Sequence, residues 1–128
     1  MTLPVLLDTH IVLWARLAPD KLSPVERATI LAAPRRYISA VSAWEIAILM
    51  ALGRVPRDSQ LVGDVPSGFE TLDISQRHAC ELLALPPLHR DPFDRMLIAQ
   101  ARSEQFALLT RDRQIARYAD AGLTVLGG

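Results

Sequence analysis

Short apolar runs alternate along the chain with longer segments in which apolar residues recur every three or four positions. Runs of a few apolar residues predict buried strands, whereas the three-to-four spacing predicts helices with one buried face. Strands that alternate with helices predict an α/β domain with right-handed crossovers and a mainly parallel sheet of about five strands. The expected strands are Leu3 to Leu7, Tyr37 to Ala40, Phe69 to Ile74, Phe106 to Leu109 and Leu123 to Leu126.

The helices are predicted from the same spacing together with residues that start or end helices. Ser23, Pro24 and Glu26 are typical of a capped helix start, and Gly53 is typical of a helix end. The segment Arg54 to Gly68 is irregular, and we expect a short helix and a loop there. One expected helix begins at Thr9. The others cover Ser23 to about Ala33, Ser42 to Leu52, Ser75 to about Leu85, about Pro92 to Glu104 and about Ile115 to Ala119.

Length and composition restrict the class of protein. The 128 residues suit one domain, covering 1–128, and the 14 basic and 14 acidic side chains give no net charge. Any nucleic-acid contact must therefore use a local patch. No apolar stretch approaches the roughly 18 residues of a membrane span, so a cytoplasmic protein without membrane contact is expected. The single cysteine, Cys80, excludes an internal disulfide, and its helical, apolar surroundings predict a buried side chain.

Acidic residues stand at the places where chemistry is expected in such a sheet. Asp8 closes the first strand, and Asp112 follows the Phe106 to Leu109 strand after two residues. In α/β sheets ligands bind at the carboxyl ends of the strands, near the point where strand order reverses. If these two strands are neighbours, both carboxylates lie at one edge. Glu45 interrupts an apolar helix, and Asp94 lies in the first turn of a later one.

Each of these acids also has a purely structural interpretation. Asp91 precedes Pro92 and is typical of a helix cap, while Asp94 could complement the helix dipole. Asp112 could cap its own helix, and Asp8 could be an ordinary turn residue. Glu45 is the hardest to explain in this way, because a carboxylate on a buried face costs free energy unless it is paired or binds a metal.

A divalent cation would let several carboxylates remain ionised side by side, since like charges a few ångströms apart raise one another's pKa. Oxygen ligands favour Mg²⁺ or Mn²⁺. Zinc is disfavoured because cysteine clusters are absent and His10, His78 and His89 are dispersed, with His78 expected to pack within its helix.

Four segments together are similar to the PIN-domain family, and most closely to the VapC-type toxins of bacterial toxin–antitoxin pairs. They are LLDTHIVLW, ISAVSAWEIAI, HRDPFDRMLIAQA and LLTRD, in family order and spacing, and the similarity covers nearly the whole chain. It implies a three-layer α/β/α sandwich, RNA as the substrate, a cognate antitoxin as inhibitor and a homodimer. The irregular Gly63 to Gly68 region departs from relatives, which commonly have a clearer helix there.

The resemblance also assigns roles to residues of this chain. The metal site and catalytic residues would be Asp8, Glu45, Asp94 and Asp112. Supporting residues would be Thr9 and Thr110, whose hydroxyls lie beside the metal site, and the adjacent Asp91.

Metal-assisted phosphodiester hydrolysis is the reaction we predict, with one or two Mg²⁺ ions activating water and stabilising charge on the phosphate. Asp8 and Asp94 are expected as primary ligands, completed by Glu45 and Asp112. Candidate phosphate contacts are the arginines that flank the acids, although the pattern favours a solvated surface charge for any single one of them: Arg90, Arg95, Arg111 and Arg113.

Two rival functions fit less well. A Mg²⁺-dependent phosphohydrolase of small esters would use the strand-end Asp as a nucleophile and would carry a second Asp close behind it, whereas Thr9 and His10 follow Asp8. A receiver or binding module would use its acids only to tune partner affinity; a receiver would need a paired acid group and a reachable lysine, but Lys21 stands alone in an expected loop. Nuclease activity that EDTA abolishes and Mg²⁺ or Mn²⁺ restores would favour the nuclease over the binding module.

Overall fold

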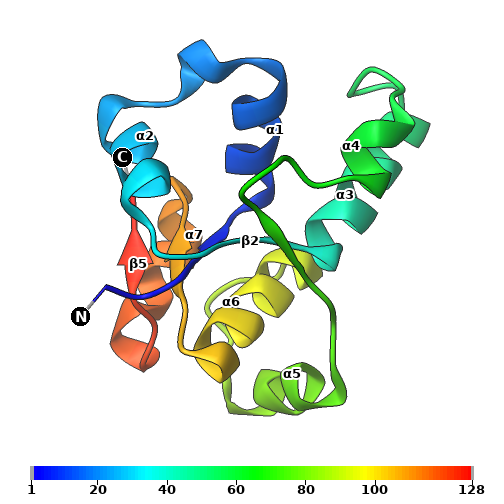
Figure 1. Ribbon diagram of the computed structural model, residues 1–128. Helices are drawn as coiled ribbons and strands as arrows, with labels where there is room; N and C mark the ends of the chain where they lie inside the picture. Colours follow the sequence, from blue (N-terminus) through cyan, green and yellow to red (C-terminus); the bar gives the residue numbers. More distant parts are fainter. Residues whose placement is uncertain (1, 128) are drawn as a thin grey trace.

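Five short strands form one sheet in the computed structural model, which describes residues 2–127 (Figure 1). All four strand pairings are parallel, and the spatial order is β3-β2-β1-β4-β5. The predicted α/β class and parallel sheet are therefore confirmed. The strands are β1 (Val5–Leu7), β2 (Arg36–Ser39), β3 (Glu70–Leu72), β4 (Ala107–Leu109) and β5 (Val125–Leu126).

Helices cover both faces of this sheet. Alternate β1 residues point to opposite sides: Val5 and Leu7 join a core with α1 and α3, whereas Leu6 joins a second core with α6. This arrangement confirms the three-layer α/β/α sandwich. The helices are α1 (Thr9–Leu17), η1 (Pro19–Lys21), α2 (Pro24–Ala32), α3 (Ala40–Ala51), α4 (Ser59–Gly63), α5 (Gln76–Glu81), η2 (Leu82–Ala84), α6 (Pro92–Glu104), α7 (Arg113–Ala116) and η3 (Arg117–Ala121). Across residues 2–127, no helix combines the length and apolar character needed to cross a membrane.

Strands β1 and β4 are neighbours, which was the condition for bringing their terminal acids together. Leu7 pairs with Leu109, and the backbone N–H of Asp8 donates to the Leu109 carbonyl at 3.0 Å. The chain adds β2 and β3 on one side of β1 and then places β4 on the other side. The order of the strands thus reverses between β1 and β4, where ligands bind in sheets of this kind.

Helix starts agree with the sequence prediction for α2 but not for α3. Ser23 and Glu26 form the expected capping box, with the two reciprocal hydrogen bonds at 3.0 and 2.8 Å. For α3 the expected start at Ser42 was wrong. Ser39, at the end of β2, caps this helix by accepting from the Val41 N–H at 2.9 Å. The strand therefore leads directly into the helix, and Ala40, which was expected to end the strand, is the first residue of the helix.

The prediction of a buried Cys80 was also wrong, because its side chain is exposed. Helix α5 has only six residues and buries a narrow face against α6. His78 occupies that face, is 2% exposed and hydrogen-bonds through Nε2 to Glu104 at 2.8 Å. The expectation that His78 packs within the fold is confirmed, and Cys80, two positions further along, faces away from α6.

Candidate metal centre

Asp8 lies at the carboxyl end of β1 and is linked to the chain that follows β4. Its side chain is 4% exposed, and Oδ2 accepts a hydrogen bond from the Thr110 hydroxyl at 2.6 Å. The same hydroxyl oxygen accepts from the backbone N–H of Asp112 at 3.0 Å. Thr110 therefore fixes the Asp8 carboxylate and the start of the Asp112 segment relative to each other. The role of Thr110 as a support of a metal site stays a prediction.

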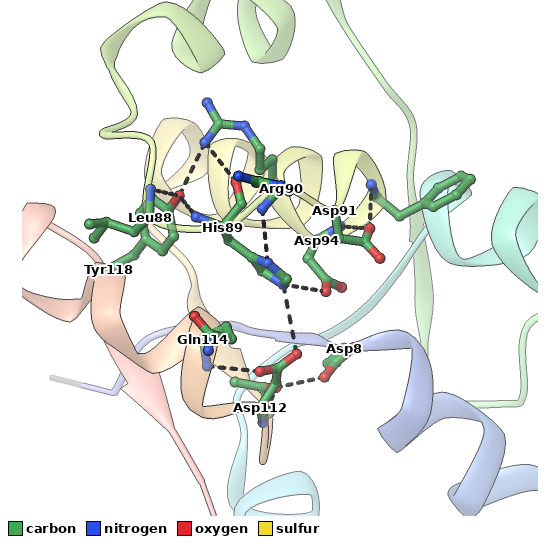
Figure 2. A network of polar contacts seen from close by, with 12 residues as sticks. Asp8, Leu88, His89, Arg90, Asp91, Asp94, Asp112, Gln114 and Tyr118 are labelled. Atoms are coloured by element: carbon green, nitrogen blue, oxygen red, sulfur yellow. Dashed lines mark hydrogen bonds and ion pairs between the residues drawn. The ribbon is translucent and has the colours of Figure 1, made fainter.

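Asp94 and Asp112 meet at the imidazole of His89. His89 Nε2 lies 2.9 Å from Asp94 Oδ2 and 3.8 Å from Asp112 Oδ2 (Figure 2). Asp94 comes from the first turn of α6, whereas Asp112 caps α7 by accepting from the Gln114 N–H at 2.8 Å. One nitrogen or oxygen atom from each of these three residues lies within 4.8 Å of the other two.

Glu45 approaches from α3, where its side chain is half-buried. Its Oε1 atom is inaccessible to solvent and has no hydrogen-bond partner among residues 2–127. Burial raises the pKa of Glu45, while the nearby Thr9 hydroxyl lowers it and the charges of Asp91 and Asp8 raise it further. Thr9 itself is held by a hydrogen bond to Ser42 at 2.9 Å.

The charges of these acids act on one another. Burial, followed by the charges of Asp8 and Asp91, raises the pKa of Asp94 to about 7, and the His89 hydrogen bond lowers it. Burial also raises the pKa of Asp8, against the Thr110 hydrogen bond, and Asp112 adds to the rise. Carboxylates from four separate elements thus lie close enough for their charges to raise the pKa values of Asp8, Glu45 and Asp94. We call Asp8, Glu45, Asp94 and Asp112 the acidic pocket.

The residues of the acidic pocket fit a hard divalent cation. Its donors are carboxylate oxygens, as Mg²⁺ and Mn²⁺ prefer, and Glu45 presents a buried oxygen without a partner. A positive charge there would favour the ionised form of every member. A cavity of about 190 Å³ beside it is lined by Asp8, His10, Ile11, Trp14, Arg111 and Asp112.

Asp91 acts as a helix cap in this structure. Its Oδ1 accepts from the backbone N–H groups of Phe93 and Asp94, at 2.8 and 3.1 Å. Pro92 occupies the first position of α6, as the cap interpretation predicted. Asp91 thus orients the turn that carries Asp94.

Replacing Asp91 by alanine should lower the free energy of unfolding by about 1 kcal/mol, the usual loss for a helix cap. Asp91→Asn should keep most of the stability, because asparagine caps equally well. Urea unfolding of both variants tests this. Equal losses for alanine and asparagine would mean that the carboxylate charge, rather than the cap, supports the fold.

The four flanking arginines differ in their surroundings. Arg95 Nη1 donates to the His89 carbonyl at 3.3 Å, and Arg111 forms a two-bond ion pair with Glu26, each bond being 2.6 Å. These two guanidinium groups are engaged within the fold. Arg90 and Arg113 are exposed and flank the acids in the sequence. They therefore stay candidates for contacts with phosphate.

His89 is the pocket residue that sequence reasoning missed. The three histidines are dispersed in the sequence, and none forms a pair at helical spacing, so the pattern gave His89 no role as a zinc ligand. Its signal was its place in the HRDPFD segment, five residues before Asp94. The helix start at Pro92 turns the chain, so His89 returns over the first turn of α6.

Comparisons with known proteins agree with this geometry. Ribonuclease VapC22 of Mycobacterium tuberculosis is 29% identical over 115 residues, which cover 87% of this chain and 88% of that protein. The structure of VapBC2 from Rickettsia felis, bound to a promoter DNA fragment, is similar with a TM-score of 0.71, 17% identity and coverage of 97% and 98% of the two chains. DNA-bound VapBC from Salmonella typhimurium gives a TM-score of 0.67, 20% identity and 98% coverage of both chains.

The two solved structures share the fold of this chain. The family model that matches is described as PIN domain, and it spans residues 5–121. That span contains the five acids and two threonines that the sequence singled out, from Asp8 to Asp112, together with His89. The chain therefore belongs to the PIN-domain family.

Proposed function

We propose that this protein is a metal-dependent endoribonuclease that hydrolyses RNA phosphodiester bonds as the toxin of a toxin–antitoxin pair. The observation that carries the proposal is the convergence of Asp8, Glu45, Asp94 and Asp112 from four parts of the chain at the β1–β4 edge. Such a cluster of carboxylates lowers the stability of a protein without a cation, so its benefit lies in binding one. The ribonuclease named among its relatives and the PIN domain support this chemistry.

Asp8 and Asp94 would hold the cation, Mg²⁺ or Mn²⁺, with Glu45 and Asp112 completing its surroundings. Bound there, the cation supplies Lewis-acid stabilisation of the phosphate charge. Glu45 or Asp112 would accept the proton of the attacking water. Thr110 keeps Asp8 oriented throughout.

Arg90 and Arg113 would bind the phosphate backbone of the RNA, because they are exposed and flank the acids. With no net charge on the whole chain, these local contacts would account for much of the attraction.

An antitoxin protein is the partner that we propose. A similar fold occurs in a structure described as a toxin–antitoxin complex from Klebsiella pneumoniae, and an anionic pocket is suited to receive an arginine from another chain. Such an arginine would occupy the place of the cation.

We also propose a homodimer that acts in the cytoplasm, where RNA is abundant. Copurification with the product of an adjacent small gene and light scattering of the purified chain test the two assemblies.

The direct test of the function is cleavage of single-stranded RNA by the purified chain. We expect cleavage in Mg²⁺ or Mn²⁺, no cleavage in EDTA, and recovery when the cation is added back. Asp8→Asn serves as the control for contaminating nucleases, because it should be inactive in every condition. Cleavage that continues in EDTA, or that is equal in Asp8→Asn, would contradict the proposal.

A further inference from the structure

The segment between η2 and α6 places His89 beside Asp94 and Asp112 of the acidic pocket. Its side chain is 16% exposed, and its Nε2 atom lies between the carboxylates of Asp94 and Asp112, as Figure 2 shows. Of these two contacts, only that to Asp94, at 2.9 Å, has hydrogen-bond length. His89 is therefore tied to one carboxylate of the pocket and adjacent to another.

Both ring nitrogens of His89 are engaged. The Nδ1 atom accepts a hydrogen bond from the backbone N–H of Arg90 at 3.1 Å, so it carries no proton in this arrangement. The proton of the neutral ring then lies on Nε2, which donates to Asp94 Oδ2. A nitrogen that donates has no lone pair for a metal, so His89 supports a ligand rather than acting as one.

Tyr118 fixes the segment that carries His89. The side chain of Tyr118 is 0% exposed, and its hydroxyl group donates to the Pro86 carbonyl at 2.8 Å. The backbone N–H groups of Leu88 and His89 both donate to the hydroxyl oxygen at 3.0 Å, and Arg95 Nη1 approaches it at 3.1 Å. One buried hydroxyl thus joins three parts of the chain directly behind His89 (Figure 2).

We propose that Tyr118 and His89 are positioning residues: Tyr118 holds the His89 backbone, and His89 holds Asp94 Oδ2 so that the other carboxylate oxygen faces the cation. The proposal rests on the proposed function only in taking the acidic pocket as the cation site. Groups behind metal ligands act in this way because a carboxylate that cannot rotate loses less conformational freedom when the cation binds. Neither residue needs to touch the RNA or the cation.

The test is the affinity for Mn²⁺ alone, measured by titration calorimetry or by the paramagnetic resonance of free Mn²⁺, without RNA. We expect His89→Leu to weaken Mn²⁺ binding by about 10- to 100-fold, the usual range for a residue behind a ligand. His89→Gln should stay within a few-fold of the parent, because its side-chain amide can reach Asp94 and donate as Nε2 does. In RNA cleavage, the same loss should disappear at saturating Mn²⁺.

Tyr118→Phe tests the second part, since it keeps the buried ring and removes only the hydroxyl. We expect Mn²⁺ binding about 10-fold weaker. Tyr37→Phe is the matched control, because Tyr37, on β2, is the other tyrosine of the chain and stacks on Phe106. If Tyr118→Phe does not fold, as judged by near-ultraviolet circular dichroism, Arg95→Met removes another of the contacts that hold the same segment.

Several outcomes would overturn this inference. Parental Mn²⁺ affinity in His89→Leu would remove His89 from the assignment, and parental affinity in Tyr118→Phe or Arg95→Met would remove the Tyr118 step. Equal losses in His89→Gln and His89→Leu, with a preference for Zn²⁺ over Mn²⁺ in the parent, would make His89 a direct ligand. A parent protein that binds no Mn²⁺ would refute the cation site itself. A parent that binds Mn²⁺ but leaves RNA intact would refute only the proposed function.

Discussion

Asp94→Asn is expected to abolish metal-dependent RNA cleavage and, at the same time, to stabilise the protein without metal. The loss of activity should exceed about 100-fold, since even residues behind metal ligands cost 10- to 100-fold. The gain in stability follows from the pKa of Asp94, which burial and the charges of Asp8 and Asp91 raise from its ordinary value of 3.8 to about 7. Asparagine has the same shape but adds no charge to the acidic pocket.

The sign of the pH dependence follows from the same shift. The folded protein holds the Asp94 proton more tightly than the unfolded chain does, so deprotonation favours unfolding. Without metal, the free energy of unfolding should therefore fall as the pH rises from about 4 to about 7. Asp94→Asn should flatten this fall by an amount on the order of a few kcal/mol, because one pKa unit corresponds to about 1.4 kcal/mol.

Urea unfolding in EDTA at pH 5 and pH 8, together with cleavage assays in Mg²⁺, measures both effects. Asp64→Asn is the matched control, because it makes the same chemical change at an exposed residue. It should leave cleavage unchanged. If Asp94→Asn retained cleavage within a few-fold, Asp94 would not be a cation ligand. If the variant lost stability at pH 8, the charge of Asp94 would not destabilise the folded protein.

Arg111→Met should produce the largest loss of stability outside the hydrophobic core. The Glu26 side chain is 0% exposed, and Arg111 is its charged partner, through Nε and Nη2 at 2.6 Å each. Arg111 also donates to the Lys21 carbonyl and lies over the Trp14 ring, 4.3 Å from its centre. Removing Arg111 leaves a buried carboxylate whose remaining hydrogen bond, among residues 2–127, comes from the Ser23 backbone N–H.

Breaking a buried pair from one side usually costs about 3 to 5 kcal/mol. We expect about 2 to 3 kcal/mol here, because the Arg111 side chain is 39% exposed and solvent screens the pair. The double variant Glu26→Gln with Arg111→Met should recover part of the loss, since no unpaired charge is then buried. Urea unfolding at pH 7 compares the three proteins.

This pair also has a pH signature. The Arg111 hydrogen bonds hold the pKa of Glu26 below its ordinary value of 4.5, against the effect of burial. A lowered carboxyl pKa contributes stability above the unfolded value, and the contribution is lost as the pH falls through the folded value. The difference between the parent and Arg111→Met should therefore shrink below pH 4.5. A difference that stayed constant down to pH 3 would assign it to packing on Trp14.

The parts of the fold that the sequence predicted well are those with local signals. Ser23 and Glu26 mark the start of α2, and Asp91 with Pro92 marks the start of α6 at the observed residue. These signals work because a cap satisfies backbone groups within a few residues. The convergence of Asp8 and Asp112 was predictable only on the condition that their strands are neighbours.

Other features depend on contacts that no local pattern encodes. Helix α3 is apolar almost all round, so its sequence does not tell which side is buried, and Trp44, at 59%, is exposed while Ile46 is buried. The Glu26–Arg111 pair joins residues 85 positions apart. Both were out of reach because tertiary packing decides them.

The placement of β1 in the middle of the sheet has a consequence for the making of the protein. Asp8 directly follows the first strand to be synthesised, yet the Thr110 hydroxyl that holds it comes 102 residues later. The pocket cannot be complete while the ribosome is still adding β4 and the turn that follows it. An incompletely synthesised chain therefore contains its first acids without their partners. In a cell that makes such a nuclease, the activity would arise only when synthesis of the chain is almost finished.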